Sequence, residues 1–471
     1  MSRPEAIPAE QDSPLPLSQR RLTVGLVTLT VSIAFEAIAV ATAMPVAARE
    51  LDGIRYYAWA FSLFVIGMLL STVVTGRICD RLGPSRPMLV GLGVFAVGLV
   101  VAGSATTMLQ LVGGRFVQGL GGGALNTAMF VMVAKAYRPA QRPRLFTFIS
   151  TGWVLPSFVG PPVSAWLTAN LSWHWVFFAD LPLVVIGGAM VLPTLLVMMR
   201  IPMPEVAEGE GSGLRPAPIW AALAVAVAAA ALQAAGQRLD VWALLLVVVA
   251  LALLAVGLPR LMPVGFLRLG RGLSSVILAR TLLPGAYFGG EAFLPLMLVE
   301  QRHVPLLVAG GTLTVGAVGW TTGSFLQANR RLPLRRDQLI TIGCLNVAVG
   351  LALAGVIALV PTLPYALIAL AWVFAGLGMG FATASTSLAT ITLSPEDAQG
   401  RNGSSLNLGD ALGSSIFVGL AGTIFGALHP GGNLSLTFGA VLLAMAVVAV
   451  LGMLASLRVG PVSDAVDEIS A

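Results

Sequence analysis

Charged residues are scarce in this chain of 471 residues: they make up 10% of it, while hydrophobic residues make up 57%. The mean hydropathy is +0.89. Apolar stretches of about 20 residues, each long enough for a helix to cross the hydrocarbon layer, recur along the sequence. A water-soluble core is therefore excluded. The apolar runs are continuous rather than alternating, which also excludes a membrane β-barrel.

Catalytic and metal-binding patterns are also missing. The sequence has no H-E-x-x-H or G-x-S-x-G segment, so a membrane-embedded enzyme has little support. The two cysteines, Cys79 and Cys344, have no metal or redox spacing, and we expect them to be free thiols. We expect neither a metal nor an organic cofactor. Lys135 is the only lysine, while arginine and alanine abound, which favours a bacterium of high GC content.

The apolar stretches predict fourteen transmembrane helices in an all-α polytopic protein. They lie at residues 22–45, 56–76, 87–105, 108–134, 144–169 and 174–198, then 218–236 and 241–259, then 274–299, 304–328, 338–360, 363–393, 402–428 and 433–456. Glycine and proline within these runs are tolerated between packed membrane helices.

The order of the spans predicts six segments of the chain. These are a cytoplasmic tail (1–21), a six-helix bundle (22–198), a cytoplasmic linker rich in Pro, Glu and Gly (199–217), two inserted transmembrane helices (218–260), a second six-helix bundle (274–456) and a cytoplasmic tail (457–471). We expect the inserted pair to be peripheral and to keep the second bundle correctly oriented.

Arginines cluster in alternate loops, which predicts that those loops, and both termini, are cytoplasmic. The clusters include Arg77, Arg81 and Arg86, then Arg138, Arg142 and Arg144, then Arg260, Arg268 and Arg271, then Arg330, Arg331, Arg335 and Arg336. The net charge of +6 thus reflects topology, and we expect no nucleic-acid partner.

A polar segment between the second and third spans has Gly76, Asp80, Arg81, Gly83 and Arg86 at fixed spacing. It resembles the signature between the second and third helices of the major facilitator superfamily, and every fixed position of that signature is filled. The resemblance implies two six-helix bundles around a central cavity that opens to alternate sides. We interpret this segment as a conformational latch, because a carboxylate there can meet a helix N-terminus and neighbouring arginines.

Two ionisable residues are similar to motifs of the fourteen-helix drug:proton antiporters, a branch of the same superfamily. Glu36, nine residues before Pro45, is similar to an acidic motif in which that branch usually has Asp. Arg115, followed by Gln118 and a run of glycines, is similar to the motif assigned to proton transfer.

Two later stretches are similar to motifs of the same branch. One is the antiporter motif of the fifth span, with Gly152, Pro156, Gly160 and Pro161, which the resemblance implies to be a kinked seam that seals against leak. The other is Trp173-His174-Trp175 followed by Asp180, where the branch usually has Arg and Asn at the second and last of these positions.

Ionisable residues inside spans are costly and normally mark a pathway. Glu36, Arg115 and Asp410 are the candidates for proton coupling. The alternatives are a fixed ion pair for Glu36 and a helix-packing clamp for Arg115. Arg280, eleven residues before Glu291, lies about 16 Å from it along the helix, which is too far for a direct pair.

Glu291, in the counterpart of the span that carries Glu36, could face the central cavity or serve as a polar anchor. Met129 and Phe158 are further candidates for the cavity wall, although ordinary apolar packing explains them equally well.

The predicted function is export of small amphipathic compounds, such as drugs, in exchange for protons, with the proton gradient as energy source. We expect a monomer in the inner membrane of a bacterium. The alternatives are an exporter of a lipid or metabolite and, more remotely, a membrane-embedded enzyme or a non-transporting sensor.

Overall fold

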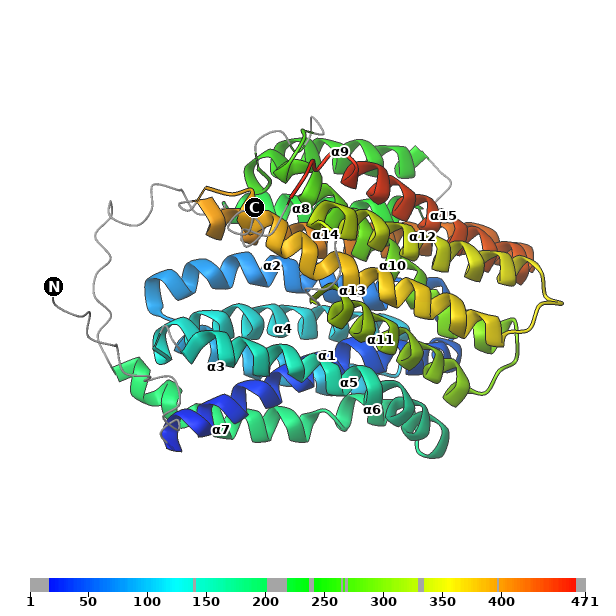
Figure 1. Ribbon diagram of the computed structural model, residues 1–471. Helices are drawn as coiled ribbons and strands as arrows, with labels where there is room; N and C mark the ends of the chain where they lie inside the picture. The colour runs from blue at the N-terminus through cyan, green and yellow to red at the C-terminus, as the bar shows by residue number, and fades with distance from the viewer. Residues whose placement is uncertain are drawn as a thin grey trace.

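A computed structural model of the chain describes residues 17–138, 141–200, 218–236, 241–263, 266, 270–328, 334–395 and 398–462. The N-terminal tail to residue 16, most of the predicted linker, Arg268, Arg330 and Arg331 lie outside the described residues. Figure 1 shows a bundle of long helices that run roughly side by side.

The described residues form fifteen α-helices. The first seven are α1 (Leu17–Glu50), α2 (Trp59–Leu82), α3 (Ser85–Gly103), α4 (Met108–Ala136), α5 (Arg142–Asn170), α6 (His174–Phe178) and α7 (Leu181–Arg200). The others are α8 (Ile219–Gly236), α9 (Val241–Leu261), α10 (Leu273–Glu300), α11 (Leu306–Ala328), α12 (Arg336–Leu359), α13 (Ala366–Thr392), α14 (Gln399–Leu428) and α15 (Leu434–Ser456).

Thirteen helical segments of the described residues are long and apolar enough to cross a bilayer, and α5, of 29 residues, lies beside α1 as a further long helix. The predicted all-α membrane fold is therefore confirmed. Several helices extend beyond the predicted spans. α1 has 34 residues and is about 51 Å long at 1.5 Å per residue, so its ends project beyond the hydrocarbon layer.

The sixth predicted span is not one continuous helix. The short helix α6 ends at Phe178, and α7 begins at Leu181. Pro182 is the second residue of α7. At the start of a helix its missing N–H costs little, but proline there prevents α6 from continuing into α7 as one helix. The break leaves Ala179 and Asp180 between the two helices.

The helices form two six-span halves with matching contacts. In the first half α1 packs against α5 and α7, and α4 against α2 and α3; in the second, α10 packs against α14 and α15, and α13 against α11 and α12. Figure 1 shows α3 to α7 in its lower part and α12, α14 and α15 in its upper part. By this correspondence α10 is the counterpart of α1, and α14 that of α5.

The two halves meet along α5 and α11, along α2 and α14, and near the C-terminal ends of α1 and α10. Arg49 of α1 forms a salt bridge with Glu300 of α10. The Tyr57 hydroxyl, before α2, donates to the carbonyl of Ala292 in α10 at 2.7 Å. These contacts join the halves at the end of the molecule opposite the Asp80 loop.

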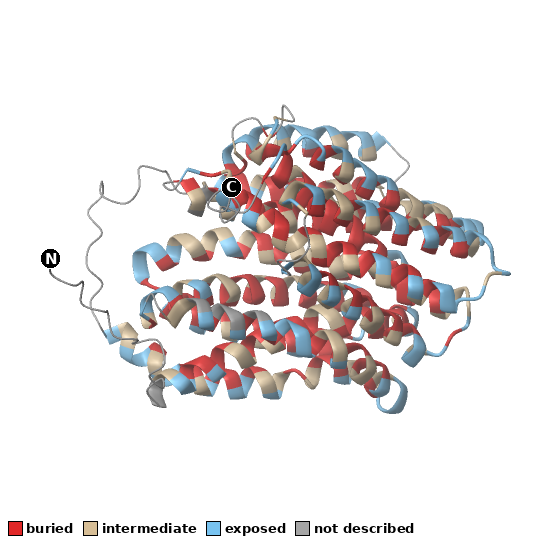
Figure 2. Ribbon diagram, viewed as in Figure 1, coloured by how far each residue is buried: buried red, intermediate tan, exposed pale blue. Residues whose placement is uncertain are grey.

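The inserted helices are less peripheral than the sequence suggested. α8 is rich in alanine, buries most of its small side chains and packs against both α2 and α14, so it lies over a seam between the halves. α9 packs on α8 and exposes large apolar residues such as Val241, Leu244 and Val248. Figure 2 shows the same contrast between buried and exposed faces over the bundle, as expected for helices that face lipid.

Candidate functional site

Glu36 of α1 and Arg115 of α4 form a buried ion pair. The two side chains are 0% and 2% exposed. Arg115 Nη1 donates to Glu36 Oε1 and, at 2.9 Å, to Gln118 Oε1, while Nε donates to the Ala60 carbonyl of α2 at 3.0 Å. The sequence marked each residue as a separate candidate. In the structure the two side chains are in contact although they lie 79 positions apart in the chain.

Small residues place Arg115 at this point. A Cβ on Gly119 would lie 2.1 Å from the Phe64 carbonyl oxygen of α2, so only glycine permits this approach of α4 to α2. The Arg115 guanidinium then lies over the Phe64 ring, 4.3 Å from its centroid. The close helix contact, the cation–π contact and the ion pair together compensate a charge that would otherwise be costly inside a membrane.

Asp180, a departure from a motif and an alternative coupling residue in the sequence, is a second buried carboxyl in this half. It is 0% exposed, and the Ser32 hydroxyl of α1 donates to its Oδ2 at 2.7 Å. Ser32 lies one helical turn before Glu36, so both side chains lie on the same face of α1. Glu36 Oε2 and Asp180 Oδ1 are both buried without a hydrogen-bond partner.

The second half contains its own ion pair. Arg280 Nη2 of α10 lies 2.9 Å from Asp410 Oδ2 of α14, and the side chains are 9% and 30% exposed. Arg280 Nη1 also donates to the Thr383 carbonyl at 2.7 Å and to the Thr386 hydroxyl at 3.1 Å. Arg280, which could not reach Glu291 along its own helix, thus finds its partner on a neighbouring helix.

Glu291 is half-buried on α10, one turn after Tyr287. The Tyr287 ring stacks on Trp372 of α13, with centroids 5.2 Å apart, and meets Trp320 of α11 edge to face at 5.6 Å. An acidic group beside a cluster of aromatic rings is chemically suited to an amphipathic or cationic molecule.

The two remaining cavity candidates lie in different surroundings. Met129 of α4 is buried, and its Sδ lies 3.8 Å from the Thr30 hydroxyl of α1. Phe158 of α5 is half-buried at the seam between the halves, where the Thr314 hydroxyl of α11 lies 3.5 Å from its carbonyl oxygen.

The fifth span runs closely beside the first. A Cβ on Gly152 would lie 3.2 Å from the Thr30 side chain of α1, whereas one on Gly160 would make an ordinary contact with Ala39 at 3.7 Å. Pro156 and Pro161 lie inside α5, which continues to Asn170. The small residues therefore bring α5 close to α1, on the side that also meets α11.

The predicted latch segment forms the end of α2 and the turn into α3. Gly83 has φ +78°, a conformation that favours glycine, and its N–H bonds to the Cys79 carbonyl at 3.0 Å. Asp80, Arg81 and Arg86 are exposed at this turn. A Cβ on Gly76 would meet nothing within 4 Å, so neighbouring atoms do not require glycine there.

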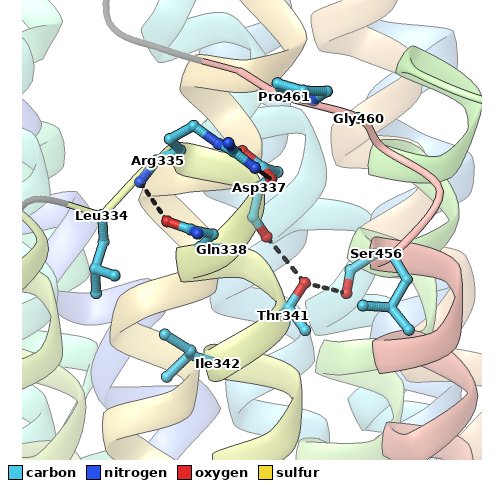
Figure 3. A pocket seen from close by; sticks show the side chains of 10 residues that line it. Leu334, Arg335, Asp337, Gln338, Thr341, Ile342, Ser456, Gly460 and Pro461 are labelled. Atoms are coloured by element: carbon cyan, nitrogen blue, oxygen red, sulfur yellow. Dashed lines mark hydrogen bonds and ion pairs between the residues drawn. The ribbon is translucent and has the colours of Figure 1, made fainter.

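A hollow of about 460 Å³ lies at the start of α12, beneath the segment that follows α15 (Figure 3). Its lining includes Leu334, Arg335, Asp337, Gln338, Thr341, Ile342, Ser456, Leu457, Gly460 and Pro461. None of the predicted site residues lines it. Asp337 pairs with Arg335 at 2.9 Å and accepts the Val462 N–H at 3.1 Å, which attaches the C-terminal segment to α12. In the described parts of the chain, no cluster of three or more His, Cys, Asp and Glu side chains could hold a metal ion.

Known proteins resemble the chain in sequence and in fold. The sequence pattern of the Major Facilitator Superfamily matches residues 24–418. Multidrug resistance protein 3 of Bacillus subtilis is 31% identical over 166 residues, which cover 35% of this chain and only 32% of that protein. A Mycobacterium tuberculosis protein named "probable multidrug-efflux transporter" is 26% identical over 444 residues, 88% of each chain.

A crystal structure of a POT family transporter aligns with 94% of this chain and 97% of its own, at a TM-score of 0.67 and 13% identity. That likeness shows the fold alone. The family match, in contrast, covers most of the chain and includes the polar segment between α2 and α3. This multi-pass membrane protein therefore belongs to the Major Facilitator Superfamily of transporters.

Proposed function

We propose that this transporter exports small amphipathic compounds, such as drugs, in exchange for protons. The observation that carries the proposal is the Glu36–Arg115 pair, a carboxyl and a guanidinium that are both enclosed within the first half. Buried charges in a membrane are retained mainly where function needs them. The resemblance of both motifs to those of drug:proton antiporters supports the same function. So do the names of two relatives, one called a multidrug resistance protein and the other a probable multidrug-efflux transporter.

In the proposed mechanism, a proton that binds Glu36 neutralises the carboxylate and weakens its hold on Arg115. The guanidinium keeps its other contacts, to Gln118 and to the Ala60 carbonyl, so it is not left without acceptors. Loss of the ion pair loosens the link between α1 and α4 and allows α1 to move relative to α10. Substrate release and proton uptake are thereby coupled through one carboxyl.

We further propose that both termini are cytoplasmic and that the protein resides in the bacterial inner membrane. The arginine-rich loops support this orientation. In this orientation the Arg49–Glu300 pair and the Tyr57–Ala292 hydrogen bond join the two halves on the outer side of the membrane. No organic cofactor or metal enters this mechanism, and a single copy of the chain suffices.

Transport by purified protein in proteoliposomes tests the proposal. Ethidium, a lipophilic cation, and Nile red, a neutral dye, serve as probes, with an imposed pH gradient and the membrane potential held at zero. We expect uphill movement of at least one probe that collapses when the gradient is removed. Probe accumulation that does not depend on the pH gradient would contradict proton coupling. Specific transport of a lipid or metabolite would favour that alternative substrate.

Asp80→Asn should slow turnover while expression and insertion stay normal. The substitution removes the charge that can interact with a helix N-terminus and neighbouring arginines in one conformation, an interaction worth fractions of a kcal/mol to about 2 kcal/mol. A several-fold lower initial rate at an unchanged final accumulation is the expected result. Exchange at the wild-type rate would remove the latch from the mechanism.

Glu291→Gln should change substrate preference rather than coupling. The half-buried carboxyl beside Tyr287 attracts positive charge, and glutamine keeps its shape without that charge. We expect ethidium transport to fall several-fold while Nile red transport stays near its original rate. Equal losses for both probes would instead indicate a structural anchor.

A further inference from the structure

Asp180 lies in the break between α6 and α7, where a carboxylate would ordinarily cap the following helix. It does not act as a cap here. Its Oδ2 accepts the Ser32 hydroxyl of α1, and its Oδ1 has no hydrogen-bond partner. Pro182 has no N–H to offer at the second position of α7. The side chain is therefore directed toward α1 and the Glu36 region rather than toward its own helix.

The buried charges of the first half do not balance if both carboxyls are ionised. In the described part of this half, the buried side chains among Asp, Glu, His, Lys and Arg are Glu36, Asp180 and Arg115, two acids and one base. Arg115 pairs with Glu36. No salt bridge of the described residues reaches Asp180. An unpaired carboxylate enclosed in a membrane protein is strongly destabilising, whereas a neutral carboxyl with one hydrogen bond is much less so.

Few titratable groups lie around Asp180. Glu36 lies one turn along α1 from Ser32. Glu50, an exposed residue at the end of α1, accepts the Trp173 indole N–H at 2.7 Å, and His174, at the start of α6, is stacked on Trp173. The buried residues of α3 and α7 include no titratable group, and neither do those that are described in α5.

We propose that Asp180 is a second proton-binding residue of this transporter. In the conformation described here, Asp180 holds a proton as a neutral carboxyl that accepts the Ser32 hydroxyl, while Glu36 is paired with Arg115. Asp180 releases that proton in the opposite conformation of the transport cycle and becomes a carboxylate there. This inference rests on the proposed proton coupling and adds a proton to each transport cycle.

The number of protons per cycle can be read from equilibrium accumulation. With the membrane potential clamped at zero, each exchanged proton contributes a tenfold accumulation of the probe per unit of pH gradient. We expect Asp180→Asn to lower the accumulation ratio tenfold per pH unit and to keep residual coupling through Glu36. Asp52→Asn is the matched control, because Asp52 is an exposed loop residue with φ +49°, which Asn also adopts readily. It should leave the ratio unchanged.

Infrared spectroscopy tests the protonation state without transport. The wild-type protein should show the C=O stretching band of a neutral carboxyl that Asp180→Asn removes, and Ser32→Ala should shift that band because the carboxyl loses its hydrogen-bond donor. If Asp180→Asn does not fold, the shift in Ser32→Ala still decides the matter. An unchanged accumulation ratio in Asp180→Asn, or no such band, overturns the inference. If probe accumulation by the wild-type protein does not depend on the pH gradient, the proposed function is wrong. The infrared band then still shows whether Asp180 is protonated.

Discussion

Glu36→Gln should reduce uphill export under an imposed pH gradient to the level of liposomes without protein. Glutamine keeps the shape and hydrogen-bonding capacity of the side chain but cannot release or bind the proton that drives the cycle. The Arg115 guanidinium stays in place through Gln118 and the Ala60 carbonyl. Substrate binding, measured by fluorescence of the dye with purified protein, should therefore persist while coupled transport is lost.

A stability control is essential for Glu36→Gln, because the substitution leaves Arg115 enclosed without a carboxylate. Removal of one partner of a buried pair typically costs about 3–5 kcal/mol. The double variant Glu36→Gln/Arg115→Gln removes both charges and should recover much of the lost thermal stability while transport remains absent. If Glu36→Gln still drives uphill export, the coupling role passes to Asp410 or Asp180.

Gly413→Ala should destabilise the second half severely. A Cβ at this position of α14 would lie 1.7 Å from the Thr281 carbonyl oxygen of α10, and that oxygen belongs to the backbone, so one helix must move. Overpacking of this kind costs about 1–3 kcal/mol and occasionally more. The neighbouring Arg280–Asp410 pair, which bridges the same two helices, should be displaced as well.

Gly426→Ala is the matched control for Gly413→Ala. It lies on the same helix, and a Cβ there would meet nothing within 4 Å. Alanine in an open helical position should be neutral or slightly stabilising, since glycine costs about 1 kcal/mol relative to alanine. Thermal unfolding of the two proteins in detergent provides the comparison. Equal midpoints would mean that α10 and α14 are not held at the described spacing.

The sequence alone determined the class of molecule and the positions of its spans. Apolar runs of about 20 residues leave few alternatives to membrane helices, because an unpaired backbone cannot lie in hydrocarbon. The cost of burial likewise marked Glu36, Arg115, Arg280 and Asp410 before any fold was known. The two inserted helices were located correctly, but their contact with both halves was missed because α8 is apolar on every side and shows no preferred face.

Tertiary structure alone decided which buried groups meet. Glu36 and Arg115 are 79 positions apart, Arg280 and Asp410 are 130 apart, and Ser32 and Asp180 are 148 apart. Each pairing depends on the rotation of a helix about its axis and on which neighbour it touches, and both are set by close packing at residues such as Gly119 and Gly413. In a soluble protein, the polar face of a helix shows which side is turned to water. A helix that is surrounded by other helices and lipid has almost no polar face, so its sequence does not show how it is rotated about its axis. The contact of Asp180 with Ser32 became visible only in the structure, because it depends on the break before α7.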